Sequence, residues 1–267
     1  MISFSLLLLL LLPSASVAVQ VDVGGSQAQQ KYQPVRPKFY SEITSPLAQL
    51  AFHHASSGEH VPSIIDTNTP IPEYESFAAY MVRKNNNNDH NRIEKQSITI
   101  ATFAGGCFWG TQLNFDREPG VIATCAGYAQ GSAIYPTYSD VCAEMTGHTE
   151  ACLVAYDPCI VQYSRLAELL FDSIPDPTML NRVGKDRGTQ YRTGLYAHST
   201  DQLQLAQLAF EKENKTWFGR DVVTEVKRAT IFWPAEEHHQ DYLKKGGRYG
   251  RSQSSEKGCT DTIRCYG

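Results

Sequence analysis

The sequence predicts an α+β protein whose core is a two-layer α/β plait, with elements in the β-α-β-β-α-β order of a ferredoxin-like core. Two observations support this prediction. From Ile98 onward, short β-branched or small apolar runs alternate with two longer segments of helical periodicity. The chain has 267 residues and a 42% apolar share, enough for one large domain or two small ones. We expect extra helices, edge strands and a coil-rich, mobile C-terminal tail around this core.

Each predicted element has its own signal. The first helix follows Cys107 and ends near Arg117, and the second, SRLAELLFDSI, sets its leucines on one face behind a Ser164 cap. A later helix starts after Ser199, with Gln202 in the capping-box position. Edge strands are expected in VVTEV and ATIFW. The four core strands are predicted in SITIATFA (97–104), VIATCAGY (121–128), EACLVAY (150–156) and YRTGLYAH (191–198).

Residues 1–18 are predicted to be a secretory signal peptide. Seven consecutive leucines form its apolar run, Pro13 ends that run, and Ser16-Val17-Ala18 supplies small residues for cleavage. A membrane anchor is the alternative, but the run is well short of the roughly 20 residues that a spanning helix needs. No stable membrane insertion is therefore expected.

Residues 19–97 are predicted to be a low-complexity linker, largely disordered, because their apolar residues lack periodic order. A short helix is expected only near Glu75–Val82. The histidines at 53, 54, 60 and 90 lack paired spacing, so we expect solvated side chains and no metal site. The folded domain is placed at 98–267, with its tail at 244–267.

Charge and cysteine usage narrow the function classes. The net charge is −4 and no basic run occurs, which gives no reason to expect a nucleic-acid partner. The seven cysteines are an odd number, so at least one thiol is expected to be free or exchanging. No CxxC spacing occurs, which argues against a zinc ribbon.

Cys107 is the candidate reactive thiol. It lies in FAGGCFWGTQ (103–112), where a predicted strand ends and a helix begins. Unpaired N–H groups and the positive end of the helix dipole are expected to lower the pKa of a thiol at this place. A buried structural cysteine is the alternative, and the glycines and aromatic residues around Cys107 favour the reactive interpretation.

Phe108 and Trp109 follow the thiol directly. Aromatic residues usually belong to the core, but neighbours at a helix start point about 100° apart and cannot both follow one core stripe. Two such walls beside a thiol would form a small apolar pocket, suited to a methyl group.

These motifs resemble the A class of the peptide methionine sulfoxide reductases, and the resemblance covers about residues 98–267. GCFWG at 106–110 is similar to the active-site signature of that family, and the tail KGCTDTIRCYG (257–267) is similar to the resolving-cysteine end of its plant-type members. Further similar blocks are GVIATCAGY (120–128), PTYSDVC (136–142), TGHTE (146–150), YDP (156–158), DPT (176–178), GKDRGTQYR (184–192) and AEEHHQDYL (235–243).

The resemblance implies an enzyme that reduces methionine S-sulfoxide, free or in proteins, and so repairs oxidative damage. Cys107 matches the nucleophile, and Phe108, Trp109 and Gly106 match the substrate-binding residues around the methyl group. Tyr138 and Tyr191 match hydroxyls that hydrogen-bond the sulfoxide oxygen, and Asp186 matches a carboxylate that orders the site.

Glu150 matches the acid of the family. Sulfoxide oxygen is a poor leaving group unless it is protonated, and burial would raise the pKa of Glu150 and keep its proton. From the residues alone, a solvated carboxylate at a strand end is the alternative.

The resemblance further implies a sulfenic acid on Cys107, a disulfide to a tail cysteine, and regeneration by a thioredoxin-like dithiol with no other cofactor. Cys259 and Cys265 match the recycling pair. We expect Cys259 to form the first disulfide and Cys265 to exchange with it, although the reverse order stays open. A monomer is expected. The remaining cysteines are interpreted as buried small apolar residues: Cys125, Cys142, Cys152 and Cys159.

Two rival functions remain open. A cysteine hydrolase or acyl transferase could pair Cys107 with His148 or His239, although we interpret both histidines as supporting or packing residues. A binding module for oxidised methionine, with an incidental thiol, is the other. The hydrolase accounts for neither the paired aromatic residues nor the two tail cysteines.

The sequence leaves the compartment and several details open. The leader predicts the secretory route, with a plastid reached through that route as the alternative, and Asn214-Lys215-Thr216 is a glycosylation sequon if the chain meets the lumen. The sequence departs from the family pattern at Gln112, Pro175 and Val183, which puts loop geometry and rate in question.

Overall fold

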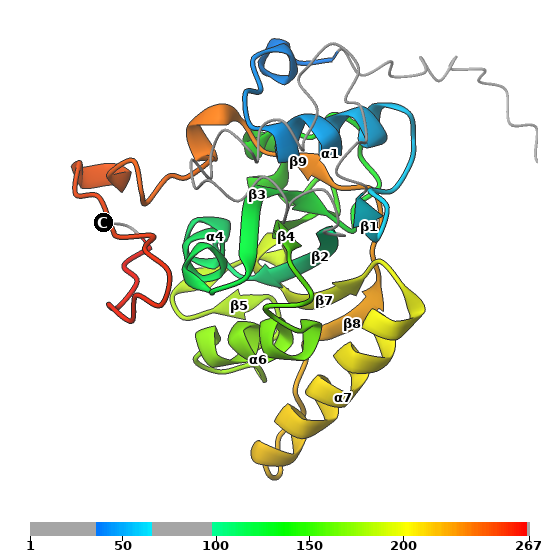
Figure 1. Ribbon diagram of the computed structural model, residues 1–267, viewed down its shortest axis with the longest axis vertical. Helices are drawn as coiled ribbons and strands as arrows, with labels where there is room; N and C mark the ends of the chain where they lie inside the picture. Colours follow the sequence, from blue (N-terminus) through cyan, green and yellow to red (C-terminus); the bar gives the residue numbers. More distant parts are fainter. Residues whose placement is uncertain (1–35, 66–97, 266–267) are drawn as a thin grey trace, which may run out of the picture. The chain divides into compact units, whose positions relative to one another are not determined.

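A computed structural model describes residues 36–65 and 98–265 (Figure 1). The predicted signal peptide and the predicted helix near Glu75–Val82 lie outside these residues. The first described elements are η1 (Lys38–Ser41), α1 (Pro46–Ser56) and β1 (Ile64–Ile65). From residue 98 the elements are β2 (Ile98–Gly105), α4 (Phe108–Arg117), β3 (Val121–Ala129), α5 (Tyr138–Cys142), β4 (Thr149–Tyr156), α6 (Tyr163–Ser173), β5 (Arg182–Val183), β6 (Asp186–Arg187), η2 (Thr189–Tyr191), β7 (Thr193–Ala197), α7 (Thr200–Thr216), β8 (Glu225–Arg228), β9 (Trp233–Pro234), η3 (Glu237–His239) and η4 (Gly247–Tyr249).

The predicted plait is confirmed. The main sheet runs in the order β8-β7-β2-β4-β3-β9, and its four central strands pair antiparallel as the split βαβ plan requires. The edge positions were also expected: β8 extends the sheet parallel to β7, and β9 pairs antiparallel with β3. β1 adds a short antiparallel pairing to β2. A separate hairpin of β5 and β6 carries Asp186.

Two apolar clusters pack against opposite faces of the sheet. Along β4, Cys152 and Val154 belong to the cluster beneath α4, α6 and α7, whereas Leu153 and Ala155 belong to the other cluster. All eight residues of β4 are buried. A strand covered on both faces takes a continuous apolar sequence rather than an alternating one, which accounts for the run EACLVAY.

Residues 36–65 correct the prediction that 19–97 is largely a disordered linker. Tyr40 and Leu47 are 2% and 1% exposed and belong to the apolar cluster that contains Leu153 and Ala155 of β4. The Tyr40 hydroxyl donates to the Pro136 carbonyl over 2.9 Å, and its ring stacks on Phe52 at 4.7 Å. α1 therefore contributes to the core on the sheet face that α4, α6 and α7 leave open. The sequence prediction failed because the sheet face that α1 covers lies far from it in the sequence.

The helices match their predictions except at one cap. α4 begins directly after Cys107 and ends at Arg117, as expected. The Ser199 side chain accepts from the Gln202 backbone N–H, which confirms the predicted cap of α7. α6 differs, because Gln162 rather than Ser164 occupies its N-cap position and no side-chain hydrogen bond caps it. Among the described residues, no helix is both long enough and apolar enough to cross a membrane.

The tail after η4 is coil, as predicted, but hydrogen bonds hold it in place. Lys257 and Arg117 join it to the end of α4, and Gln253 joins two points of the tail to each other. Residues 251–265 are thus coil that is hydrogen-bonded to the body of the protein, and the mobility of the tail stays a prediction.

Candidate active site

A glycine turn places Cys107 at the start of α4. β2 ends at Gly105, Cys107 is the N-cap of the helix, and Gly106 between them has φ +82°. A Cβ on Gly106 would lie 2.6 Å from Cβ of Val183, so both the backbone conformation and the close packing require glycine.

The Cys107 thiol is buried and lies close to the carboxyl group of Glu150. The side chain is 8% exposed, and its sulfur is hydrogen-bonded to the Cys265 thiol. This hydrogen bond, followed by burial and the charge of Glu150, raises the pKa of Cys107 well above its ordinary value. The predicted lowering by the helix N-terminus is therefore wrong for the substrate-free protein, because lost hydration and an acidic neighbour outweigh the dipole. The resting thiol keeps its proton and donates it toward Cys265, which lowers the pKa of Cys265.

Glu150 lies on β4 and is 1% exposed. One carboxyl oxygen, Oε2, accepts the Phe108 backbone N–H over 2.9 Å, and Oε1 has no partner within the described residues. Burial raises the pKa of Glu150 to about 8, and the bond from Phe108 offsets only part of this effect. At neutral pH the group is a carboxylic acid whose second oxygen is free to donate. A solvated carboxylate at a strand end does not fit these observations.

Tyr138 and Tyr191 approach the same carboxyl group from different segments. Tyr138 begins α5, where a Thr137–Asp140 capping box holds the helix start, and Tyr191 ends η2. Burial, followed by the charge of Glu150, raises the pKa of both phenols. Both hydroxyls therefore stay protonated and can donate hydrogen bonds. Asp186 lies close enough for its charge to raise the pKa of Glu150 and Tyr191.

Phe108 and Trp109 form part of a larger aromatic group. Phe108 is 1% exposed and its ring lies 6.1 Å from that of Tyr138, whereas Trp109 is half-buried. The Trp109 ring stacks on Tyr242 at 3.9 Å, and its indole N–H donates to Nδ1 of His239 over 3.2 Å. Tyr242 was not singled out from the sequence, although it lies in the block AEEHHQDYL (235–243).

The two histidines of the hydrolase hypothesis make their hydrogen bonds with residues other than Cys107. Nδ1 of His148 accepts the Gly131 N–H over 3.1 Å and Nε2 donates to the Ala133 carbonyl over 2.8 Å, so both ring nitrogens are occupied. His239 accepts from Trp109 through Nδ1, and burial lowers its pKa to about 4. Both residues support their surroundings, as the sequence analysis interpreted them.

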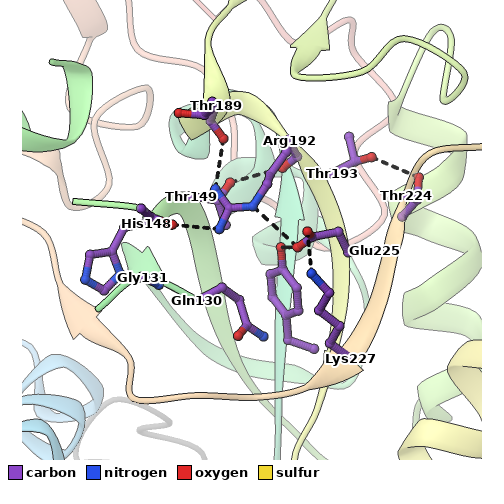
Figure 2. A network of polar contacts seen from close by, with 12 residues as sticks. Gln130, Gly131, His148, Thr149, Thr189, Arg192, Thr193, Thr224, Glu225 and Lys227 are labelled. Atoms are coloured by element: carbon purple, nitrogen blue, oxygen red, sulfur yellow. Dashed lines mark hydrogen bonds and ion pairs between the residues drawn. The ribbon is translucent and has the colours of Figure 1, made fainter. Parts of the chain in front are cut away.

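A polar network is centred on Arg192 and includes Thr149 and Thr189 (Figure 2). The Arg192 guanidinium donates to the carbonyls of Thr189 and Gly147, each over 2.9 Å, and to Glu225 over 3.4 Å. Thr149, next to Glu150 on β4, donates to the Arg192 carbonyl over 3.0 Å. The network connects the start of β4 and η2 to β8.

The two tail cysteines lie at different distances from the nucleophile. Cys265 contacts Cys107, and its sulfur would lie 2.6 Å from a Cβ built on Gly110 of α4. The structure thus places Cys265, and not the expected Cys259, beside Cys107. Both tail cysteines and Cys107 line one cavity of about 560 Å³ between α4, the β5–β6 hairpin and the tail. Cys259 therefore faces the same cavity as the other two thiols.

The other four cysteines divide into two kinds. Cys125 and Cys152 are fully buried, as predicted. Cys142 is partly buried and its side chain is hydrogen-bonded to Tyr138, and Cys159 is exposed, so the prediction of buried apolar residues is wrong for these two. Cys142 ends α5 and Cys159 lies in the loop before α6, and solvent reaches both positions.

The three departures from the family pattern occupy positions around the nucleophile. Gln112 accepts the Asp241 backbone N–H through Oε1 over 2.9 Å, and so joins α4 to the segment that carries Tyr242. Pro175 and Val183 line the shared cavity. Among the described residues, no group of three His, Cys, Asp or Glu side chains is placed to hold a metal ion.

A buried thiol on an α/β plait, with a protonated carboxyl group beside it and two further thiols within reach, defines a thiol-dependent redox site. The model of the family "Peptide methionine sulfoxide reductase" matches residues 99–264. The chain belongs to this family.

Relatives and solved structures agree with this assignment. The chain is 51% identical over 168 residues to a peptide methionine sulfoxide reductase of Brassica napus, and 48% identical over 168 residues to the chloroplastic peptide methionine sulfoxide reductase A4 of Arabidopsis thaliana. Each match covers 63% of this chain, and the chain spans 65% and 64% of the length of these relatives. The crystal structure of reduced Mxr1 from Saccharomyces cerevisiae matches 60% of this chain and 93% of its own at 32% identity, with a TM-score of 0.52.

Proposed function

We propose that the protein reduces methionine S-sulfoxide, free and in proteins, to methionine. The observation that carries this proposal is the buried Glu150, a carboxylic acid at neutral pH with one unpaired oxygen, beside the Cys107 thiol. A sulfoxide oxygen leaves sulfur only when it is protonated, and this pair supplies a nucleophile and a proton to one small site. Family membership supports the same reaction.

The proposed reaction transfers one oxygen atom. The Cys107 sulfur attacks the sulfoxide sulfur, and Glu150 protonates the sulfoxide oxygen, with Tyr138 and Tyr191 donating hydrogen bonds to it. The sulfur–oxygen bond of the substrate breaks as the oxygen passes to Cys107. Methionine and a Cys107 sulfenic acid result, and the thiol proton of Cys107 restores the proton that Glu150 gave. Phe108 and Trp109 are proposed to hold the methyl group.

The sulfenic acid is then resolved by the tail. The Cys265 thiol attacks it, forming the Cys107–Cys265 disulfide and releasing water. The hydrogen bond between these two thiols supports this order over the one expected from the sequence. Cys259 exchanges with Cys265, and a thioredoxin-like dithiol reduces the Cys259–Cys265 disulfide that results. No other cofactor is required by this cycle.

The compartment is proposed from two sources. The predicted leader indicates the secretory route, and the chloroplastic relative from Arabidopsis thaliana supports the plastid alternative. A fluorescent fusion of the whole chain, compared with one that lacks residues 1–18, distinguishes the two. Lumenal protein with a glycosidase-sensitive mass would support the secretory route and plastid fluorescence the alternative.

The reaction is tested with the two sulfoxide epimers supplied separately, dithiothreitol as reductant and methionine as the measured product. We expect turnover of the S epimer only. Cys107→Ser should abolish it, and Trp109→Ala should mainly raise KM. Cys159→Ser, which removes an exposed thiol, is the matched control and should keep wild-type activity. Activity in Cys107→Ser, or turnover of an ester but not a sulfoxide, would contradict the proposal.

A further inference from the structure

The C-terminal tail runs antiparallel to α4, beside the helix that presents Cys107. At the C-terminal end of the helix, the Gly258 backbone N–H donates to the Arg117 carbonyl over 2.7 Å. At its start, the Cys265 sulfur lies against Gly110. The segment from Gly258 to Cys265 therefore spans most of the helix, and its position fixes where the Cys265 sulfur lies.

Lys257 binds backbone carbonyls at the end of α4, at the residue that follows it and at the start of β3. Its ammonium donates to the carbonyls of Asp116 over 2.6 Å, Glu118 over 3.1 Å and Val121 over 2.7 Å. The final carbonyls of a helix have no partner within the helix and lie at the negative end of its dipole, which favours a cation. A three-donor ammonium meets three acceptors here, so this tail residue has one well-defined position.

Arg117 holds the tail on both sides of Cys259. Its guanidinium donates to the Ser254 carbonyl over 2.8 Å through Nε and to the Asp261 carbonyl over 2.6 Å through Nη1. The side chain is 6% exposed. A buried arginine that binds two carbonyls seven residues apart keeps the intervening loop compact, because its planar donors have fixed directions.

Gln253 closes the loop next to Cys265. Its amide nitrogen donates to the Arg264 carbonyl over 2.8 Å, and its amide oxygen accepts the Arg264 N–H over 2.9 Å. The Gln253 backbone N–H donates in turn to the Leu243 carbonyl over 3.0 Å. The residue directly before Cys265 is thus tied to the body of the protein through one buried glutamine.

We propose that Lys257, Arg117 and Gln253 are positioning residues for the step that forms the Cys107–Cys265 disulfide. The inference rests on the proposed reductase function. In this step Cys265–SH attacks the Cys107 sulfenic sulfur, and an S–S bond replaces the S–O bond. The oxygen leaves as water, which takes one proton from the Cys265 thiol and keeps the proton of the sulfenic acid. The three side chains touch neither sulfur. They hold the tail against α4, so that Cys265 meets the sulfenic acid without a search through open coil conformations.

The test separates the first chemical step from disulfide formation. The reduced full-length protein is mixed with one equivalent of methionine S-sulfoxide and quenched over time. Methionine reports attack by Cys107, trapping with dimedone reports the sulfenic acid, and peptide mapping reports the Cys107–Cys265 disulfide. Lys257→Met is compared with Arg251→Met, since Arg251 lies in the same tail and its side chain makes no hydrogen bond or ion pair with the described residues.

We expect Lys257→Met to form methionine at the wild-type rate but to form the disulfide about 10- to 100-fold more slowly, the range that misplacement of a reacting group produces. Sulfenic acid should accumulate in that variant and not in Arg251→Met. Gln253→Ala leaves the sequence of α4 unchanged. This variant should likewise form methionine at the wild-type rate and the disulfide more slowly. Wild-type disulfide formation in both variants, or equal slowing of both steps, would overturn the proposal.

Hydrogen peroxide makes the test independent of the reductase activity. In a background where Ser replaces the exposed Cys159, one equivalent oxidises one thiol of the Cys107–Cys265 pair to a sulfenic acid, the other thiol condenses with it, and the peroxide is itself reduced to water. Should the wild type form no methionine from the sulfoxide, the proposed function fails. The effect of Lys257→Met on disulfide formation after peroxide would still support or overturn the positioning role.

Discussion

The Cys265 sulfur fills the space that a side chain on Gly110 would occupy: a Cβ there would lie 2.6 Å from it. Gly110 lies within the first turn of α4, where alanine is otherwise favoured over glycine by roughly 0.5–1 kcal/mol. The glycine therefore costs helix stability and gives the tail sulfur room beside Cys107.

Gly110→Ala should displace Cys265 from Cys107. We expect methionine to form once per enzyme as in the wild type, and the Cys107–Cys265 disulfide to form more slowly. Thermal unfolding should show no loss of stability in a Cys265→Gly background, where the sulfur that the added Cβ would meet is absent. Quantitative peptide mapping after one turnover measures the effect. A wild-type yield of disulfide in Gly110→Ala would show that the tail reaches Cys107 from another direction.

Glu150→Gln should reduce kcat by about 10²–10⁴, because the amide cannot deliver a proton. The wild-type kcat/KM should fall as pH rises through about 8, where Glu150 loses its proton. Steady-state rates from pH 6 to 10 with dithiothreitol measure both. The variant should lack the decline that belongs to this group. A variant with near wild-type rate would place the acid elsewhere.

Burial of Glu150 should also affect stability. Its folded pKa of about 8 lies above the ordinary value of 4.5, so between these values the folded protein binds the extra proton and stability falls as pH rises. Urea unfolding at pH 6 and pH 9 should show a smaller decrease in the free energy of unfolding for Glu150→Gln than for the wild type. An equal loss would show that other groups cause it.

His198 should make the protein sensitive to mild acid. Nδ1 donates to the Val61 carbonyl over 3.0 Å and Nε2 accepts from Thr102 over 2.8 Å, while burial lowers the pKa to about 4. Since the unfolded histidine binds its proton near 6.5, stability should fall as pH drops from 6.5 toward 4. His198→Asn should weaken this dependence and His53→Gln, an exposed control, should not. Equal acid sensitivity in all three proteins would contradict this assignment.

Leu47→Ala should destabilise the protein by about 2–5 kcal/mol, the usual range for a buried leucine. Leu47 is 1% exposed in the cluster that α1 shares with the sheet. Ser56→Ala, at the exposed end of the same helix, is the control. Chemical denaturation measures the difference. Equal stability of the two variants would mean that α1 does not belong to the core.

The sequence predicted the β-α-β-β-α-β order of the core elements because apolar strand runs, helical periodicity and one helix cap are local signals. FAGGCFWGTQ also predicted the strand-to-helix turn at Cys107, since the glycines and the start of apolar helical periodicity lie together. α1 was missed because its contribution depends on an open sheet face that lies far away in sequence. The unbroken apolar run of β4 was the one local sign that something covers that face.

The site also contains features that the sequence predicts locally and features that it does not. Roles that depend on a local motif, such as those of Cys107 and Phe108, were predicted from neighbouring residues. The raised pKa of Cys107 was not, because it depends on Cys265, which lies 158 positions away in the chain. The anchoring of the tail by Lys257 was likewise missed, since polar and glycine-rich sequence predicts mobility unless its partners are known.

The packing of Tyr40 limits where a maturation protease can act on this chain. Cleavage after Ala18 would leave the segment from Arg36 to Ile65 whole. Cleavage beyond Tyr40 would remove the hydroxyl that binds Pro136 and the ring that stacks on Phe52, and would leave the mature enzyme with an exposed aromatic surface beside Trp233. We therefore expect that any cleavage of a leader that keeps the enzyme folded precedes Tyr40.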